Sequence, residues 1–248
     1  MNVEIRVEAA GRTHVGHVRR RNEDAYYQGQ WLYAVVDGLG GHVAGDIASA
    51  TAIDAVKVSD RQVSVGDLAH ALGTAISDAD VALRRRVRAE PALAGMGTTM
   101  VAMLRSGDAA VLANIGDSRA YLMRDFKATH GRLVQISEDH TYRHLVAGAG
   151  DVPGLPEKLA RFLDGRNDGR SPDLTTLRLH PGERYLLCSD GLSSYVPEDL
   201  IQAALNTPHH PSHVAEALIA SALDHGGRDN VTVVVIDIES GNVESGPG

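Results

Sequence analysis

The sequence predicts an α+β fold in which antiparallel sheets pack against helices. About nine short segments combine β-branched and aromatic residues in runs bounded by Gly or Asp, and about five others repeat apolar residues at helical spacing. The strands between residues 98 and 136 are joined by short turns, which are typical of antiparallel hairpins. Helices come in pairs between runs of strands, and this order argues against a doubly wound parallel sheet.

The strands follow from apolar runs that end at turn residues. The run Trp31 to Val36 stops at Asp37 and a glycine, and Ser106-Gly107-Asp108 separates two later runs by a tight turn. On the same criteria we expect strands at residues 2–8, 31–36, 98–105, 109–115, 119–124, 132–136, 175–180, 184–189 and 231–238.

The clearest helix is expected at residues 66–90, where apolar side chains recur at three- and four-residue steps and form one stripe. Pro197 and Pro211 suit the first turn of two further helices. The other expected helices span 44–57, 139–148, 198–206 and 212–224. Residues 148–172 have loop composition around a short helix at 156–163, and we interpret them as a flap over a site. We expect residues 1–240 to form a single domain and 241–248 a flexible polar tail.

Composition excludes several classes of protein. The chain has 248 residues, of which 43% are apolar and 23% charged, as in a folded globular protein. Its formal charge of −8 argues against a nucleic-acid partner. The single cysteine, Cys188, excludes an internal disulfide and a multi-cysteine metal site, and it favours a cytoplasmic location. No apolar run approaches the roughly 18 residues that a membrane segment needs, and the N-terminus lacks a signal peptide.

Four aspartates share one kind of position in the sequence. Asp37, Asp117, Asp190 and Asp229 each lie beside an apolar strand with a glycine close by. Each of them alone is an ordinary turn aspartate. As a set they could meet where the ends of the sheets converge, and a hard cation such as Mg²⁺ or Mn²⁺, rather than Zn²⁺, would then offset their repulsion. The residues alone leave both interpretations open.

The run of residues 19–24, Arg-Arg-Arg-Asn-Glu-Asp, places cations directly before carboxylates. One interpretation is a solvated charge run. The other is an arginine that binds phosphate bidentately beside carboxylates that hold metal-bound water. Together with the four aspartates, the second interpretation indicates metal-assisted phosphate hydrolysis.

Other hydrolase chemistries fail on spacing. A cysteine phosphatase needs Arg six residues after its cysteine, but Ser194 stands there. No G-x-S-x-G, H-E-x-x-H or phosphate-loop motif occurs, and Val43 replaces the third glycine of a dinucleotide motif. The histidines at 209, 210 and 213 are interpreted as a surface cluster.

Six ordered motifs carry a resemblance to a known family. They are Arg19-x-x-Asn22-Glu23-Asp24, Val36-Asp37-Gly38-Leu39-Gly40-Gly41-His42, Gly97-Thr98-Thr99, Asn114-Ile115-Gly116-Asp117-Ser118-Arg119, Cys188-Ser189-Asp190-Gly191-Leu192 and Gly227-Arg228-Asp229-Asn230-Val231-Thr232. In order and spacing they resemble the metal-dependent protein phosphatases, in particular the bacterial branch of the type 2C serine/threonine phosphatases. The resemblance covers residues 12 to 238.

The resemblance implies a two-sheet antiparallel β-sandwich flanked by helix pairs, in four α-β-β-α layers, with two Mn²⁺ or Mg²⁺ ions in a cleft at one end. By motif, Asp37 resembles the carboxylate that bridges both ions, and Gly38 the residue whose carbonyl binds the second ion. Asp190 and Asp229 match the remaining ligands of the first ion.

The remaining motif positions imply further roles. Glu23 and Asp24 match the pair that holds metal-bound waters, and Arg19 matches the phosphate-binding arginine. Asp117 matches a third, weaker metal site of bacterial members, which Asp190 would share. The implied reaction is direct attack of a metal-activated water on phosphoserine or phosphothreonine, with Arg19 and Asp37 as catalytic residues. The implied partners are phosphorylated proteins, substrates of a serine/threonine kinase, and the kinase itself.

Two departures from the family pattern matter. Eukaryotic members have a histidine two residues after the bridging aspartate, where this chain has Leu39, so the general acid is unassigned; His42 is nearby, and a structural role in the glycine turn is favoured for it. The flap pattern is also unclear in residues 148–172. Two alternatives remain. A phosphatase of an anti-sigma-factor antagonist generally lacks the Arg19 motif, and a catalytically dead binding domain would be expected to have lost metal ligands.

Overall fold

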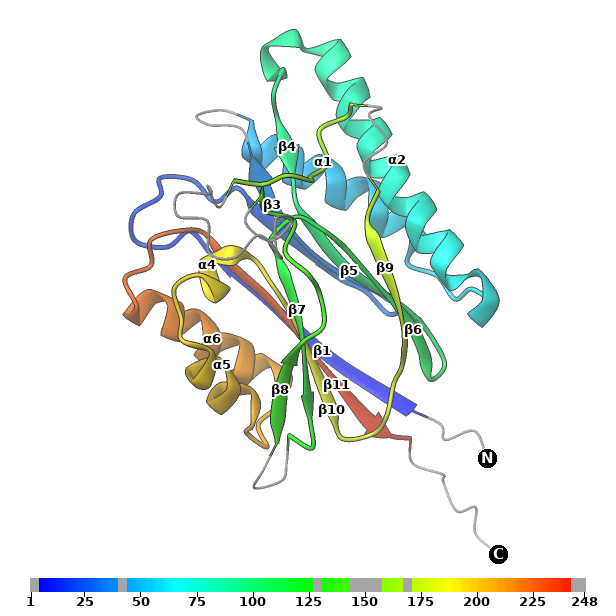
Figure 1. Cartoon of the computed structure of the whole chain (residues 1–248), viewed down its shortest axis with the longest axis vertical. Coiled ribbons are helices and arrows are strands. Elements are labelled where there is room, and N and C mark those ends of the chain that lie inside the picture. The colour runs from blue at the N-terminus through cyan, green and yellow to red at the C-terminus, as the bar shows by residue number, and fades with distance from the viewer. Residues whose placement is uncertain (1–4, 40–43, 127–130, 143–157, 167–170, 242–248) are drawn as a thin grey trace, which may run out of the picture.

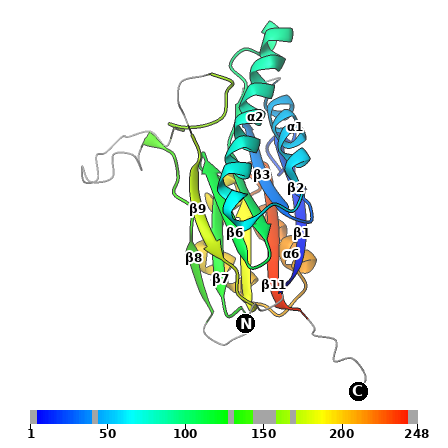
Figure 2. The ribbon, with the colours of Figure 1, turned by 90° about the vertical axis from the view of Figure 1, so that its right-hand side faces the viewer.

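The computed structural model describes residues 5–39, 44–126, 131–142, 158–166 and 171–241. Two antiparallel sheets face each other, and helices cover both outer faces, as Figures 1 and 2 show from two directions. The predicted four layers are therefore confirmed. No helix in these ranges has both the length and the apolar character needed to cross a bilayer.

The first sheet has five strands, and all its pairings are antiparallel. In spatial order they are β1 (Ile5–His14), β11 (Val231–Ser240), β10 (Glu183–Cys188), β7 (Arg119–Arg124) and β8 (Arg132–Gln135). The strands β10 and β11 lie in the middle and are buried almost throughout. Their continuous apolar sequence is typical of strands that are covered on both faces.

The second sheet has six strands. In spatial order they are β2 (Asp24–Gln28), β3 (Leu32–Leu39), β5 (Met100–Ser106), β6 (Ala109–Ile115) and β9 (Asp173–Arg178), and the short β4 (Gly97–Thr98) pairs with β3. A single predicted strand at 98–105 is thus divided between β4 and β5, with Thr99 at the division. This interruption lies beside the candidate site.

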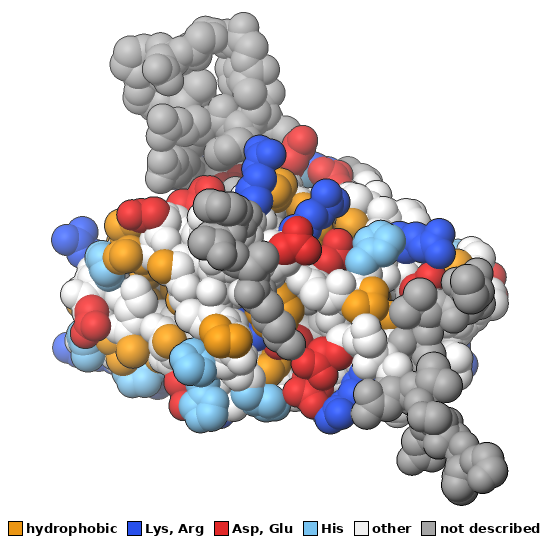
Figure 3. Space-filling model, turned by 90° about the horizontal axis from the view of Figure 1, so that it is seen from below, with side chains coloured by type: hydrophobic (Ala, Val, Ile, Leu, Met, Phe, Trp, Pro, Cys, Tyr) orange, Lys and Arg blue, Asp and Glu red, His pale blue; other side chains and the backbone are white. Residues whose placement is uncertain are grey.

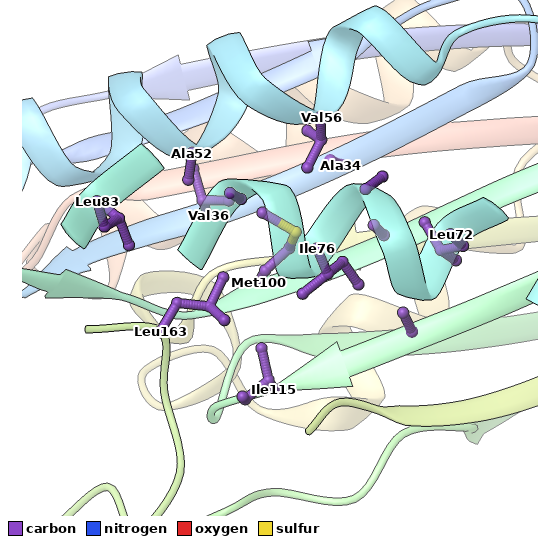
Figure 4. Packing of buried hydrophobic residues seen from close by; sticks show 14 of the residues in the cluster. Ala34, Val36, Ala52, Val56, Leu72, Ile76, Leu83, Met100, Ile115 and Leu163 are labelled. Atoms are coloured by element: carbon purple, nitrogen blue, oxygen red, sulfur yellow. The ribbon is translucent and has the colours of Figure 1, made fainter. Parts of the chain in front are cut away.

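Three apolar clusters hold the layers together. One fills the space between the sheets, with Tyr33 and Val234 among its buried members. Another lies between the second sheet and the helices α1 (Gly45–Val56) and α2 (Leu68–Ala89), where Figure 4 shows side chains of both helices meeting those of the strands. The third lies under α5 (Glu198–Leu205) and α6 (Pro211–Asp224) on the first sheet.

Most predicted elements are confirmed within a few residues, and three differ. Strand β2 was missed because its sequence, Asp-Ala-Tyr-Tyr-Gln, is short and polar at both ends. The expected short helix at 156–163 is wrong over 158–163, where Leu159 and Leu163 form isolated β-bridges with Thr141 and Thr98. The expected helix at 139–148 is absent at 139–141. Tyr142 is helical, and the remainder of that expected helix, most of the expected flap and residues 242–248 lie outside the described residues.

Charged side chains are mixed on the surface. On the described part of the face seen in Figure 3, Lys and Arg side chains are interspersed with Asp and Glu rather than gathered in one basic patch. Several exposed ion pairs, such as Arg12 with Glu216 at 2.7 Å, join opposite charges directly. Pairs of this kind contribute little to stability, so the structure owes its stability mainly to the three apolar clusters.

Candidate metal centre and phosphate site

The predicted site residues come from both sheets and lie at strand ends, where they meet at one end of the sandwich. Asp24 begins β2 and stands opposite Asp37 of β3 in the strand register. Asp190 is the first residue of α4 (Asp190–Ser193), directly after β10. Asp229 precedes β11, and Asp117 lies in the turn between β6 and β7. Strands far apart in sequence therefore bring these carboxylates together.

The backbone of Asp37 is fixed by two threonines. Its N–H donates to Thr99 Oγ1 at 3.0 Å, and its carbonyl accepts from Thr98 Oγ1 at 2.8 Å and from the Thr99 N–H at 2.9 Å. The Thr99 hydroxyl also bonds the hydroxyl of Ser118 at 2.7 Å, beside Asp117. The two aspartate turns are thus joined through side-chain hydroxyls, which holds the Asp37 backbone while its carboxylate stays available.

Two glycines let Glu23 approach the Gly38 carbonyl. A Cβ placed on Gly38 would lie 2.1 Å from the carbonyl oxygen of Gly45, so no other residue fits there. A Cβ on Gly45 would lie 2.8 Å from both Glu23 Oε2 and the Gly38 oxygen. The Glu23 carboxylate and the Gly38 carbonyl therefore lie against the same glycine, and both are oxygen donors of the kind that hard cations prefer.

Asp24 is the most enclosed of the predicted carboxylates. Its Oδ2 accepts from the Ser189 hydroxyl at 2.7 Å, whereas its Oδ1 has no hydrogen-bond partner among the described residues. Burial raises the pKa of Asp24, the hydrogen bond from Ser189 lowers it, and the negative charges of Asp190 and Asp229 raise it, with a net result of about 7. A buried carboxylate with one unpartnered oxygen is costly unless a cation or a proton compensates it.

The other carboxylates repeat this pattern. Burial, followed by the charges of Asp24, Asp190 and Asp117, raises the pKa of Asp37 well above its usual value, and Asp37 shares a hydrogen bond with Asp190. Burial and the charge of Asp190 raise the pKa of Asp117 to about 7. Asp190 Oδ1 has no partner among the described residues. An all-oxygen cluster with this excess of negative charge fits Mn²⁺ or Mg²⁺.

These side chains do not form a closed cage. In the described part of the chain, no three His, Cys, Asp or Glu side chains converge on one point tightly enough to hold an ion by themselves. Part of the reason is that Arg19 Nη2 binds Asp229 Oδ2 at 2.7 Å, and this ion pair holds the Asp229 carboxylate apart from the other carboxylates. The donor set therefore fits ions that retain several waters, as Mg²⁺ usually does.

Arg19 lies over the carboxylates with about half of its side chain exposed. Burial alone would lower the pKa of Arg19, but the hydrogen bond to Asp229 and the charges of Asp37 and Glu23 raise it overall. The guanidinium thus stands where it faces both solvent and the carboxylate cluster. An arginine in this position can bind two oxygens of a phosphate.

Asn230 connects the two loops that carry Arg19 and Asp229, a role that sequence reasoning missed. Its Nδ2 donates to the carbonyls of Val15 and Arg21, both at 2.9 Å, and its Oδ1 accepts from the Glu23 N–H at 2.8 Å. Asn230 is buried. The only sequence signal was its place next to Asp229, because hydrogen bonds over more than 200 residues leave no local pattern.

His140 supports the turn that precedes Asp117, and sequence reasoning missed this role too. Its Nδ1 accepts from the Gly116 N–H at 3.2 Å, so its Nε2 carries the proton toward Asp173 Oδ2 at 2.9 Å. The His140 backbone N–H also donates to the Gly116 carbonyl at 2.9 Å. Burial lowers the pKa of His140, which favours this neutral form. The turn is thus held from two sides.

The structure brings the predicted site residues together at one end of the sandwich. Among the described residues, a few other positions that the sequence suggested do not join them. Asp24, Asp37, Asp117 and Asp190 interact directly or through charge, while Asp229 is bound to Arg19. Of the two residues considered near the general-acid position, Leu39 ends β3, and His42 lies outside the described residues. No described residue of the expected flap joins the carboxylates.

Comparison with known proteins agrees with this geometry. The family described as protein phosphatase 2C matches residues 10–223. The serine/threonine protein phosphatase PstP of Mycobacterium tuberculosis is 40% identical over 95% of this chain, and the serine/threonine phosphatase stp of Listeria monocytogenes is 32% identical over 93% of this chain and 96% of its own length. The chain spans about half the length of PstP, 46%.

Solved structures give the same result for the fold. The catalytic domain of PstP in complex with two manganese ions is 41% identical, covers 95% of this chain and all of that domain, and superposes with a TM-score of 0.86. The likeness therefore extends over both sheets and both helix layers. With a matching family over most of its length and relatives at this identity, the chain belongs to the protein phosphatase 2C family.

Proposed function

We propose that this protein is a metal-dependent serine/threonine phosphoprotein phosphatase. The observation that carries the proposal is the set of buried carboxylates Asp24, Asp37, Asp117 and Asp190, whose pKa values burial and mutual repulsion raise, with the Arg19 guanidinium beside it. Relatives named as serine/threonine phosphatases support the activity, and a PstP domain with two manganese ions supports the choice of metal. Phosphorylated proteins are then the substrates.

The ligands follow from the positions of the oxygens. We assign Asp37 to both ions because its carboxylate has Asp24, Asp117 and Asp190 around it. We assign Asp190 and Asp229 as the remaining ligands of the first ion. The Gly38 carbonyl and Glu23, which lie against the same glycine, are assigned to the second ion. Asp24 orients bound water through its unpartnered Oδ1. Asp117, which interacts with Asp190, is assigned to a weaker third site.

The ions, when bound, supply an activated water and offset charge on the attacking and leaving oxygens. The residues of the chain supply position. Arg19 releases Asp229 and binds nonbridging oxygens of the phosphoryl group, where negative charge develops. Thr98 and Thr99 hold Asp37, and Asn230 holds the Arg19 loop against Asp229, so the carboxylates and the guanidinium keep their spacing.

Phosphoserine and phosphothreonine arise by transfer from a kinase, so the substrates are products of a serine/threonine kinase, and the autophosphorylated kinase is itself a candidate. We place this reaction in the cytoplasm. The fully buried and unpaired thiol of Cys188 is compatible with a reducing compartment. Dephosphorylation of a co-expressed kinase, followed by mass spectrometry, would test this part of the proposal.

The test of the activity is hydrolysis of a phosphothreonine peptide and of p-nitrophenyl phosphate in Mn²⁺, in Mg²⁺ and in excess EDTA. We expect turnover with either ion and none in EDTA. A folded protein that binds the phosphopeptide without turnover in both ions would contradict the proposal and favour a catalytically dead binding domain.

A pair of arginine variants tests the phosphate site. Arg19→Lys keeps the charge but loses the bidentate geometry, so we expect kcat/KM to fall about tenfold to a hundredfold. Arg20→Lys is the matched control, because Arg20 is exposed and makes no ion pair with a described residue. Equal activity of the two variants would remove Arg19 from the site.

A further inference from the structure

A pocket of about 250 Å³ lies at the open edge between the two sheets. Leu112 and Asn114 of β6 and Asp173 and Thr175 of β9 line one side of it; β6 and β9 run side by side in Figure 2. Ile136, Ser137 and Glu138, which follow β8, line the other side. The residues around the pocket are mostly polar, although Leu112 belongs to the apolar cluster between the sheets and Ile136 packs against that cluster.

Asn114, in the wall of this pocket, has a side-chain oxygen that accepts no hydrogen bond from a described residue. The side chain is 3% exposed, and its Nδ2 donates to the Glu138 carbonyl at 2.8 Å and more weakly to the Gly116 carbonyl at 3.4 Å. These two carbonyls fix the orientation of the amide, since turning it over would bring oxygens together. Asn114 Oδ1 then has no partner among the described residues. A buried acceptor in this state lacks an N–H or O–H group.

Two carboxylates add negative charge to the same pocket. Glu138 is exposed and forms no ion pair with a described residue. Asp173 is about half exposed and is held in place by His140 and by two hydrogen bonds from Arg161. Because Arg161 offsets the charge of Asp173, the net charge of the pocket comes mainly from Glu138. A cationic N–H donor is the kind of ligand that carries both the N–H group that Asn114 lacks and the charge that Glu138 attracts.

The pocket is close to the candidate catalytic centre. Asn114 precedes Asp117 by three residues, and three residues span at most about 11 Å even when fully extended. We propose that the pocket is a substrate subsite that accepts the side chain of a lysine or arginine a few residues from the phosphorylated residue. This inference rests on the proposed phosphatase function and defines the substrate class further: phosphoproteins with a basic residue near the phosphorylation site.

The test compares phosphothreonine peptides that differ only by Lys or Gln at each position from four before to four after the phosphothreonine. We expect one position where Lys raises kcat/KM about fivefold over Gln, as one ion pair at a partly exposed site allows. Glu138→Gln should abolish this preference, and Glu138→Lys should reverse it toward Glu at the same position. Hydrolysis of p-nitrophenyl phosphate should be unchanged in both variants.

Glu216→Gln is the matched control, since Glu216 is an exposed carboxylate on the outer helix α6. It should keep the wild-type preference for Lys. A wild-type protein with no preference at any position, or a preference that both Glu138 variants retain, would overturn the proposal and leave an ordered water as the partner of Asn114.

Binding of the same peptides with a non-hydrolysable phosphonate, measured by fluorescence anisotropy, separates the two proposals. A protein without turnover that still binds the Lys peptide about fivefold more tightly, with loss in Glu138→Gln, would contradict the phosphatase function but retain the basic subsite. Turnover of all peptides at one rate would contradict the subsite alone.

Discussion

Two groups of buried charge in this protein are built in opposite ways. Arg184 is fully buried, and all five of its N–H groups are used: two bind the Asp237 carboxylate at 2.6 and 2.7 Å, and the others bind the carbonyls of Leu205, Thr207 and His209. The ring of Phe126 lies 4.0 Å from the guanidinium. This charge is compensated within the chain, and its hydrogen bonds join β10 and β11 to the end of α5 and the segment after it.

The carboxylate cluster has no such compensation. Burial and mutual repulsion raise the pKa of Asp37, Asp117 and Asp24, and oxygens of Asp24 and Asp190 have no partner among the described residues. The same fold provides an acceptor for all five N–H groups of Arg184 but, among the described residues, no donor for these buried carboxylate oxygens. The difference indicates that the first group is structural, and it supports the proposal that the second binds ions from solution.

The largest expected effect is on the compensated group. Arg184→Met leaves the Asp237 carboxylate and three carbonyls buried without donors, so we expect the free energy of unfolding to fall by about 3–5 kcal/mol. Urea denaturation followed by circular dichroism measures this. Asp237→Leu added to Arg184→Met should recover part of the loss. A loss below about 1 kcal/mol would show that the ion pair is not the structural element described.

The cluster should respond to ions instead. At a free Mn²⁺ concentration one hundred times its dissociation constant, the free energy of unfolding should rise by about 2.7 kcal/mol over the value in EDTA. Asp190→Asn should remove this increase, whereas Arg184→Met should retain it whenever the variant folds. Thermal unfolding with and without Mn²⁺ distinguishes these outcomes, and an unchanged midpoint in the wild type would contradict the metal assignment.

The sequence predicted most strands and helices and the carboxylates because these leave local patterns, whereas the four layers were expected from the resemblance of its motifs to the phosphatase family. Period-two and continuous apolar runs mark strands, and an aspartate next to glycine marks their ends. It could not predict the ion pair of Arg184, which depends on the register that places Arg184 opposite Asp237 across two strands. The same holds for the hydroxyl contact of Thr99 with Ser118, which exists only when two separate turns meet.

The described part of the expected flap shows a different reason for failure. Residues 158–163 have a helical composition, but Leu163 joins the apolar cluster under α2, and its backbone exchanges hydrogen bonds with Thr98 at 2.8 and 2.9 Å. Tertiary contacts therefore override local propensity in this segment. The pairing also links this segment to Thr98, whose hydroxyl binds the Asp37 carbonyl.

Asp60 is a carboxylate that, unlike those of the cluster, is compensated by donors within the chain. It accepts the N–H groups of Trp31, Leu32 and Gln30 and the hydroxyl of Tyr27, at 2.7 to 3.1 Å. Although burial opposes it, these hydrogen bonds lower the pKa of Asp60. Asp60→Asn should therefore reduce the free energy of unfolding by about 2 kcal/mol at neutral pH.

The sign of the pH dependence follows from that lowered pKa. The stabilisation by Asp60 is fully present above the ordinary aspartate pKa of about 4 and is lost as the pH falls through the lower value of the folded state. The difference between wild type and Asp60→Asn should be constant from about pH 5 to 8 and shrink below about pH 4. A difference that grows on acidification would be inconsistent with this cradle of N–H donors.

Asp37→Asn is the variant for which the two kinds of buried charge predict opposite signs. If the cluster were structural, like Arg184 and Asp237, the substitution would destabilise the protein in every condition. Because burial and neighbouring carboxylates raise the pKa of Asp37, ionisation of this group opposes folding at neutral pH, and the neutral amide should increase the free energy of unfolding by about 1 kcal/mol in EDTA.

In saturating Mn²⁺ the order of stability of the wild type and Asp37→Asn should invert, since the wild type gains the binding energy of the ions and the variant does not. Parallel urea titrations of both proteins at pH 7.5, with EDTA and with Mn²⁺, measure the two signs. Destabilisation in EDTA would mean that groups within the chain compensate the ionised Asp37 carboxylate, and the distinction between the two regions would then fail at its central residue.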